Sequence, residues 1–340
     1  MNPPLEVTAR YPRAIYVELT DRCNLTCPMC RCATVAGDKL ELETFRDIAA
    51  TLFPHAAFVD LRGWGESTIL PDFDLYLDVT LHFDVKVKLI TNGTVNRPDL
   101  WRRLGTAGVT TGISFDAAEA GAFAQIRGGA KLSRVVETAR QLVAACREGG
   151  HDPAEKVYFC VTASRWNIAQ LKGIVDIGLS LGVTRFKIDP LSAPEGDPGL
   201  LETVPAEVRQ AAEELSQISA RTGCRIEYSS SLLPELTNEM AVRKVCIHPW
   251  DYCYINSRGR IGFCDHLNGK EEFTWGEWGR QPFLTFWNGP RMTELRSQHL
   301  RRLKGEPIAA CADCNWCYDR RYMDLEDWVA PEWDRYRVTA

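Results

Sequence analysis

Residues 14–30, AIYVELTDRCNLTCPMC, decide the fold of this chain. Residues 14–19 are largely apolar and partly β-branched, which predicts a strand. Three cysteines follow at CxxxCxxC spacing, namely Cys23, Cys27 and Cys30. Cysteine thiolates on short loops hold iron–sulfur clusters, and three ligands leave one iron of a four-iron cluster open to a substrate or cofactor. A structural zinc site with a distant fourth ligand is the alternative interpretation.

Outward from this stretch, strand-like and helix-like segments alternate along the chain. The predicted strands are residues 14–19, 58–61, 85–90, 111–115, 156–162 and 185–188. The predicted helices are residues 42–52, 73–81, 99–107, 134–148, 168–181 and 205–222. This alternation predicts βα units with a parallel sheet and right-handed crossovers. The expected fold class is α/β, a partial (β/α)6 barrel of the TIM type rather than a closed eight-stranded one.

The composition and pattern of the sequence change near residue 230, where helical periodicity weakens and Trp, Gly and Cys become frequent. We therefore place a domain boundary between residues 229 and 243. The expected domains are a core at 1–235 and a small Cys-rich domain at 236–340. The cysteines of the second domain are Cys246, Cys253, Cys264, Cys311, Cys314 and Cys317.

The composition excludes several classes of protein. With 340 residues, 45% hydrophobic and 25% charged, the chain has a globular composition. The net charge of -5 gives no basic footprint, so no nucleic-acid partner is expected. No stretch approaches the length of a membrane span and no apolar signal region opens the chain, so we expect no membrane partner and a cytoplasmic location. Thirteen cysteines in a reducing compartment indicate metal binding or catalysis rather than disulfides.

The cysteine loop and the motifs that follow it resemble, in order, those of the radical S-adenosylmethionine (SAM) superfamily. Residues 62–66 (RGWGE) resemble the GGE motif, with Trp in the middle position, and residues 91–94 (TNGT) resemble the TNG turn. Residues 112–116 (GISFD) and 126–129 (IRGG) match the segments that come next in that family. Each motif has a plainer interpretation alone, as a turn or a helix cap, and their order carries the resemblance.

The resemblance implies a cofactor chemistry. In this family the three cysteines, here Cys23, Cys27 and Cys30, hold a [4Fe–4S] cluster whose open iron chelates the amino and carboxylate groups of SAM. One electron then cleaves SAM to methionine and a 5′-deoxyadenosyl radical, which abstracts a hydrogen atom. The implied cofactor-binding residues are Gly63, Trp64, Gly65, Glu66, Asn92, Ser114 and Asp116. A flavodoxin- or ferredoxin-like protein is the implied electron donor.

The C-terminal cysteines resemble the SPASM/twitch extension of radical SAM enzymes, a β-hairpin followed by a helix. The short twitch form implies one auxiliary [4Fe–4S] cluster, whose ligands here would be Cys246, Cys264, Cys311 and Cys314. A zinc ribbon with similar cysteine pairs is the alternative. Cys253 and Cys317 are left over, as inert thiols or as hydrogen-atom donors. His248 and His266 lie beside the implied ligands, as supporting or surface residues.

Twitch-type relatives modify carbohydrates and aminocyclitols in antibiotic biosynthesis, and the resemblance implies a small carbohydrate-type substrate. About 12 residues precede the first strand, too few for a leader-peptide domain there. The favoured reaction is oxidation of a carbinol to a ketone, with the auxiliary cluster taking an electron. The alternatives are redox-neutral decarboxylation or dehydration of a sugar-acid nucleoside, epimerisation with Cys253 or Cys317 as hydrogen donor, and a non-enzymatic metal-binding scaffold.

Three charged residues are candidates for contact with the substrate, because residues at the C-terminal ends of barrel strands usually serve the active site. Glu18 would accept hydrogen bonds from substrate hydroxyls. Lys187 or Arg62 would bind a carboxylate or assist deprotonation. A salt bridge within the sheet is the alternative for each.

Overall fold

The computed structural model describes residues 6–30, 37–228, 246, 248–264 and 273–302. The chain forms two compact units. Unit 1 consists of Met1–Arg22, Val35–Val87 and Asn238–Ala340, and unit 2 consists of Cys23–Thr34 and Lys88–Thr237. The expected domain boundary after residue 235 lies outside the described residues and stays a prediction.

Unit 1 contains a mixed sheet built around the first strand. Its strands are β1 (Ala14–Val17), β2 (Phe58–Asp60), β8 (Tyr252–Ile255), β9 (Arg260–Gly262) and β10 (Thr274–Glu277). Strand β1 pairs in parallel with β2 on one side and with β8 on the other, while β9 runs antiparallel to both β8 and β10. Strand β1 therefore lies between partners from opposite ends of the sequence. Its side chains are fully buried, except that Tyr16 is 3% exposed.

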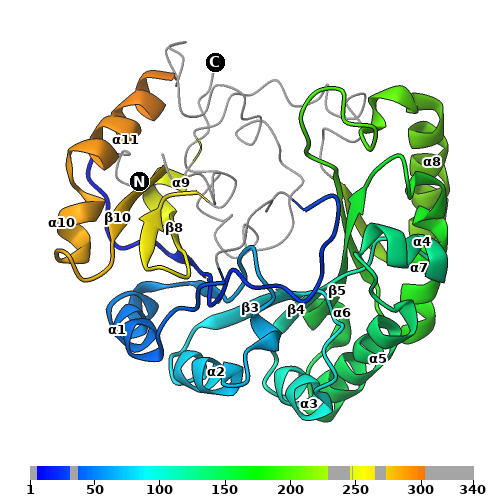
Figure 1. Cartoon of the computed structure of the whole chain (residues 1–340), viewed down its shortest axis with the longest axis horizontal. Coiled ribbons are helices and arrows are strands. Elements are labelled where there is room, and N and C mark those ends of the chain that lie inside the picture. Colours follow the sequence, from blue (N-terminus) through cyan, green and yellow to red (C-terminus); the bar gives the residue numbers. More distant parts are fainter. Residues whose placement is uncertain (1–5, 31–36, 229–245, 247, 265–272, 303–340) are drawn as a thin grey trace. The chain divides into compact units, whose positions relative to one another are not determined.

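The helices of unit 1 come from two parts of the sequence, one near the N-terminus and one near the C-terminus. They are α1 (Leu42–Leu52), α2 (Phe73–Leu81), α9 (His248–Asp251), α10 (Phe283–Trp287) and α11 (Pro290–Arg302), with 3-10 turns η1 (Phe53–His55) and η2 (Ser67–Ile69). Figure 1 shows α10 and α11 beside the β8–β10 strands. Within α10, the aromatic rings of Phe283 and Trp287 stack with centroids 5.5 Å apart, an i,i+4 contact that supports the short helix.

Unit 2 holds a series of parallel strands, each paired with the next along the chain. They are β3 (Lys86–Thr91, in unit 2 from Lys88), β4 (Thr110–Ser114), β5 (Val157–Ala163), β6 (Arg185–Pro190) and β7 (Arg225–Tyr228). The helices between them are α3 (Pro98–Thr106), α4 (Ala120–Ile126), α5 (Leu132–Glu148), α6 (Pro153–Lys156), α7 (Leu171–Leu181) and α8 (Pro205–Thr222), with η3 (Ile168–Gln170) and η4 (Leu201–Thr203).

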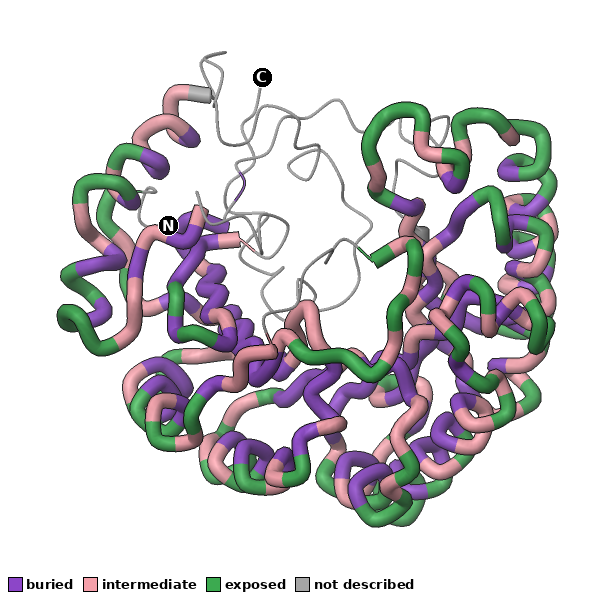
Figure 2. Tube along the Cα trace, viewed as in Figure 1, coloured by how far each residue is buried: buried purple, intermediate pink, exposed green. Residues whose placement is uncertain are grey.

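The helices of unit 2 cover the outer side of its strands (Figure 1). Figure 2 shows that burial follows the strands and the helix faces turned toward them. Helices α3 and α5 approach closely at Gly105, where an added Cβ would lie 2.4 Å from the Cβ of Ala145. Helix α7 ends at Gly182, whose φ of +85° is the left-handed C-cap conformation that glycine adopts without strain. These glycines allow the close packing of α3 with α5 and the end of α7.

The expected α/β fold class, a partial barrel with a small C-terminal hairpin domain, is confirmed. All six predicted strands and six predicted helices form within about three residues of the expected bounds. The structure adds α4, whose short segment gives little periodicity, and β7, where charged residues alternate with Ile226 and Tyr228. Among the described residues, no helix is both long and apolar enough to cross a membrane.

Candidate active site

The loop after β1 carries the three predicted cluster cysteines. Cys23 and Cys30 are exposed and Cys27 is half-buried, and the Cys30 N–H donates to the Cys27 carbonyl at 3.0 Å. Burial raises the pKa of the Cys27 thiol; the guanidinium of Arg127 lowers it, and the neighbouring cysteines raise it. The three thiols are therefore close enough to interact, and a bound metal would hold them as thiolates.

The donor set of this loop fits an iron–sulfur cluster. In the described part of the chain, no three Cys, His, Asp or Glu side chains converge on a site for one metal ion. The fit thus depends on chemistry: three cysteine ligands on one short loop, beside a guanidinium and an amide N–H that favour thiolate charge. A fourth cysteine near this loop, Cys32, does not fit the CxxxCxxC pattern, is not expected to be a ligand and lies outside the described residues.

Asn92 in the turn after β3 supports the start of the cysteine loop. Its Nδ2 donates to Oδ1 of Asn24 at 2.9 Å and points at the sulfur of Cys23 at 3.7 Å. Its Oδ1 accepts from the N–H and the hydroxyl of Thr94 at 2.9 and 2.7 Å. Gly93, with a φ of +68°, makes this turn possible. The predicted contact of Asn92 with SAM stays a prediction.

Asp116 and the IRGG segment support the loop from a second direction. Asp116 is 1% exposed, and its Oδ1 accepts from the Thr162 N–H at 2.6 Å while its Oδ2 accepts from Arg127 at 3.2 Å. Burial raises the pKa of Asp116, and Arg127 and the Thr162 N–H oppose that shift. Gly128 has a φ of +54°, and an added Cβ would lie 2.6 Å from the backbone carbon of Thr26. Asp116 therefore orients Arg127 toward the cysteines.

Ser114, the remaining predicted cofactor residue of unit 2, is the last residue of β4. It is half-buried and lies in register with Cys160 on β5. Asp116 follows it by two positions, just beyond the end of the strand. The structure thus brings Ser114 and Asp116 to the carboxyl end of one strand, where the predicted contacts with SAM stay predictions.

The RGWGE loop of unit 1 lies directly against the chain that leaves β1. The Glu66 N–H donates to the Arg22 carbonyl at 2.7 Å. A Cβ on Gly65 would lie 2.4 Å from the carbonyl oxygens of Thr20 and Arg22, so glycine is required there. Glu66 is buried, and its Oε1 accepts from the N–H and the hydroxyl of Thr68 at 3.2 and 2.6 Å.

The predicted substrate residues are all engaged within the chain. The Glu18 carboxylate is 3% exposed and accepts three hydrogen bonds from the protein. Arg62 pairs with Asp60 at 3.1 Å, and its guanidinium lies 5.1 Å from the ring centroid of Tyr16. Lys187 Nζ lies 3.8 Å from Oδ2 of Asp189. Their contact with substrate stays a prediction.

Two of the predicted auxiliary ligands meet at one imidazole in unit 1. The sulfurs of Cys246 and Cys264 lie 3.3 and 3.8 Å from Nδ1 of His248. His248 is 2% exposed, and its ring meets the ring of Tyr252 edge-on at 4.0 Å. This convergence of two thiols fits the expected cluster ligation. The other predicted ligands and neighbours, Cys311, Cys314, Cys317 and His266, lie outside the described residues.

Cys253 lies in the middle of β8, opposite Ile15 of β1. It is fully buried, and burial raises the pKa of its thiol. A neutral thiol packed inside a sheet fits the inert interpretation of this residue, and its predicted role as a hydrogen-atom donor stays a prediction.

Comparison with known families identifies the two parts of the chain. Residues 17–174 match the model of the Radical SAM superfamily. Residues 246–315 match the model of SPASM, an iron–sulfur cluster-binding domain. The chain combines a radical SAM domain with a SPASM domain. The radical SAM match covers just under half of the chain, and the two matches together support SAM, a SAM-binding [4Fe–4S] cluster and auxiliary iron–sulfur clusters as cofactors.

Curated relatives match this chain over different lengths. Mycofactocin maturase MftC of Mycobacterium tuberculosis is 33% identical over 183 residues, which is 52% of this chain and 45% of that protein. The match thus spans less than half the length of the maturase. The AdoMet-dependent heme synthase of Methanosarcina barkeri is 24% identical over 94% of this chain and 95% of that protein.

Solved structures show the same fold. SuiB of Streptococcus suis bound to S-adenosylmethionine has a TM-score of 0.68 at 16% identity, covering 90% of this chain and 71% of SuiB. The anSMEcpe protein with bound AdoMet and the Cp18Cys peptide has a TM-score of 0.66 at 14% identity, covering 90% of this chain and 86% of that one. These similarities show the fold of the chain.

The sequence motifs include Arg127 and His248 but do not specify what these residues contact. Arg127 belongs to the IRGG segment, and its charge acts on Cys27 only in the folded chain. His248 follows Cys246 by two residues, which is the signal in the sequence, and its contact with two sulfurs depends on tertiary structure.

Proposed function

We propose that this enzyme abstracts a hydrogen atom from a polar, carbohydrate-type substrate in the biosynthesis of a natural product such as an antibiotic. The observation that supports it is the cysteine loop, held by Asn92 and Gly128 in a unit whose strands carry rows of charged residues. When bound, the cluster and SAM supply a 5′-deoxyadenosyl radical after one electron arrives from a flavodoxin- or ferredoxin-like donor.

The charged rows of unit 2 are the proposed substrate contacts. Lys187 of β6 lies in register with Cys160 on β5 and with Glu227 on β7. Asp189, two residues further along β6, lies on the same face of that strand because side chains alternate along a strand. Neighbouring cations and carboxylates suit hydroxyl, amino and carboxylate groups, which sugars, aminocyclitols and nucleosides carry.

The favoured reaction is oxidation of a carbinol to a ketone. The carbinol carbon loses a hydrogen atom, its hydroxyl loses a proton, and the resulting radical loses one electron as the C=O bond forms. The hydrogen atom would end in 5′-deoxyadenosine, the proton would pass to a basic group, and an auxiliary cluster held in part by Cys246 and Cys264 would accept the electron. Lys187 is a candidate for orienting the hydroxyl, and Arg62 for binding a substrate carboxylate.

Modification of a peptide is the second candidate, and the comparisons favour it. A solved structure with this fold is described as SuiB bound to the precursor peptide SuiA, and a curated relative is a maturase. The charged row of β6 and β7 would equally suit the backbone and side chains of a peptide. Decarboxylation, dehydration and epimerisation remain as alternative outcomes for either substrate.

The deciding experiment measures SAM cleavage and its coupling to substrate. The enzyme, reconstituted without oxygen, is incubated with SAM and dithionite, and 5′-deoxyadenosine is measured by mass spectrometry. Wild type should form it, and Cys30→Ala should not. Panels of aminocyclitols, sugars, nucleosides and peptides are then screened for faster cleavage and for a product two mass units lighter. Release of CO2 or incorporation of deuterium from D2O would instead indicate decarboxylation or epimerisation, and stimulation by peptides alone would overturn the carbohydrate proposal.

A further inference from the structure

Glu18, the first residue after β1, is a buried carboxylate whose two oxygens are both occupied. Its Oε2 accepts from the Trp64 N–H at 2.7 Å and from the Tyr254 hydroxyl at 2.8 Å. Its Oε1 accepts from the Ser257 N–H at 3.2 Å. A carboxylate that is 3% exposed would carry a large desolvation cost without such donors, and these three hydrogen bonds offset that cost and fix its position.

The three donors come from two separate segments of unit 1. Trp64 belongs to the RGWGE loop after β2, while Tyr254 and Ser257 belong to β8 and to the turn between β8 and β9. The loop approaches Glu18 so closely that a Cβ on Gly63 would lie 2.2 Å from Glu18 Cγ. Glycine at position 63 therefore lets the loop reach the carboxylate of Glu18, because a larger residue would push the loop away from it.

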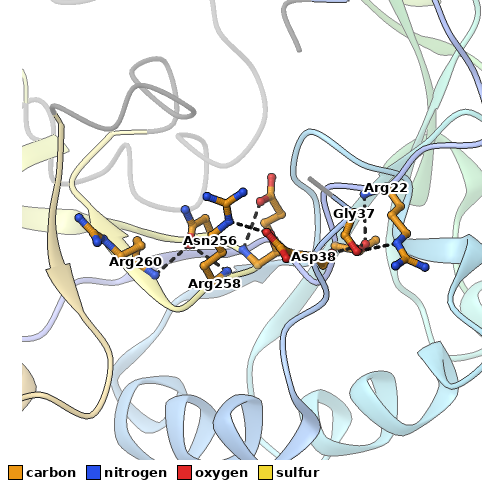
Figure 3. Close-up of polar contacts among 9 residues, drawn as sticks. Arg22, Gly37, Asp38, Asn256, Arg258 and Arg260 are labelled. Atoms are coloured by element: carbon orange, nitrogen blue, oxygen red, sulfur yellow. Dashed lines mark hydrogen bonds and ion pairs between the residues drawn. The ribbon is translucent and has the colours of Figure 1, made fainter. Parts of the chain in front are cut away.

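The β8–β9 turn is itself firmly held. Oδ1 of Asn256 accepts from the Arg258 and Arg260 N–H groups at 3.0 and 2.8 Å, and Arg258 pairs with Asp38 (Figure 3). The segment that carries Asp38 is also tied back, because Nε of Arg22 donates to the Gly37 carbonyl at 2.6 Å (Figure 3). The turn thus gives Glu18 a fixed support through the Ser257 N–H.

We infer that Glu18 is a positioning residue: it fixes the RGWGE loop for SAM through the Trp64 N–H and connects that loop to the β8–β9 hairpin of the SPASM domain. The inference rests on the proposed function, in which this loop binds SAM. It assigns Glu18 a role different from contact with substrate. It also gives the hairpin a part in SAM binding that is separate from ligation of the auxiliary cluster.

Glu18→Gln tests the inference because it keeps the size of the side chain. Two of the donors, Trp64 N–H and Ser257 N–H, are backbone groups that cannot turn around. In either orientation of the amide, its NH2 therefore faces one of these N–H groups, and one hydrogen bond is replaced by a contact between two donors. The matched control is Asp251→Asn, which weakens the Arg13–Asp251 ion pair (2.7 Å) at the other end of β1.

The measurements are the Kd of SAM for the anaerobically reconstituted enzyme by calorimetry, the change that SAM makes in the electron paramagnetic resonance spectrum, and the melting temperature. Glu18→Gln should raise the Kd roughly tenfold and reduce the spectral change at a given SAM concentration. Asp251→Asn should lower the melting temperature and leave the Kd unchanged. Equal Kd values for Glu18→Gln and wild type, or equal losses in both variants, would overturn the inference.

Tyr254→Phe covers the case in which Glu18→Gln fails to fold. It leaves both N–H donors and removes only the hydroxyl that shares Oε2 with Trp64. The Kd of SAM should rise roughly threefold, and an unchanged Kd would overturn the support by the hairpin. A wild-type enzyme that binds no SAM would instead contradict the proposed function itself. Failure of the proposed function can therefore be distinguished from failure of the inference about Glu18.

Discussion

The cysteines of the cluster loop depend on residues that no metal would touch. Asn92 joins the turn after β3 to Asn24, and Arg127 lies beside Cys27 because Asp116 holds it there. A loop of three exposed or half-exposed cysteines has little apolar contact of its own. Its shape therefore depends on such hydrogen bonds.

Asn92→Ala should loosen the cysteine loop, because it removes the bonds to Asn24 and Thr94 and the N–H directed at Cys23. We expect faster loss of iron from the SAM-binding cluster to a chelator, by a factor of about ten for roughly 1–2 kcal/mol of lost support. The matched control is Asn96→Ala, which removes an exposed side chain whose Oδ1 accepts from Arg134 at 2.9 Å. Equal rates of iron loss in the two variants would contradict this reading of Asn92.

Gly128→Ala should prevent normal assembly of the cluster. Its φ of +54° costs an alanine about 1–2 kcal/mol, and the added Cβ would also collide with the backbone of Thr26. The control is Gly129→Ala, which has a φ of +88° but nothing within 4 Å of the new Cβ. Iron content after reconstitution should fall in Gly128→Ala well below Gly129→Ala. Similar iron contents would show that conformation alone, and not the contact, limits this position.

At the scale of elements, helices α3 and α5 can approach closely because residue 105 is a glycine. Gly105→Ala should lower the free energy of unfolding by about 1–3 kcal/mol, since its Cβ would overlap with that of Ala145. In Gly121→Ala, within α4, the added Cβ would have no other atom within 4 Å. This variant should raise the free energy of unfolding by about 0.5–1 kcal/mol. Urea unfolding followed by circular dichroism compares the two, and a stabilised Gly105→Ala would refute the contact.

Elements with their own periodicity and the parallel sheet of the βα units could be predicted from the sequence, whereas the pairing of strands far apart in the sequence could not. Helices at 42–52, 73–81 and 205–222 have the predicted bounds, because each buries an apolar stripe that is local in sequence. Strand β8 pairs with β1, and nothing in residues 252–255 specifies so distant a partner. The same limit applies to the site. The cysteine ligands follow from spacing, whereas the bonds from Glu18 to Trp64 and Tyr254 depend on tertiary structure.

At the scale of the whole molecule, the two domains predict an iron count. Two cubane clusters hold roughly eight irons per chain, four in each. A Cys246→Ala, Cys264→Ala double variant should keep roughly four irons and still cleave SAM. The control is Cys146→Ala, a buried thiol in α5 that should retain the full iron content. Roughly four irons in the wild type would contradict the auxiliary cluster and turn attention to redox-neutral chemistry.

The position of β1 between β2 and β8 also has a consequence for how the chain is made. The ribosome completes β1 and β2 early, whereas β8 emerges after most of the chain has been synthesised. At about 5–20 residues per second, the interval is on the order of 10–50 seconds. During that time one side of an apolar strand can template the wrong neighbour. Expression at lower temperature with co-produced chaperones should therefore raise the yield of this enzyme more than a stronger promoter would.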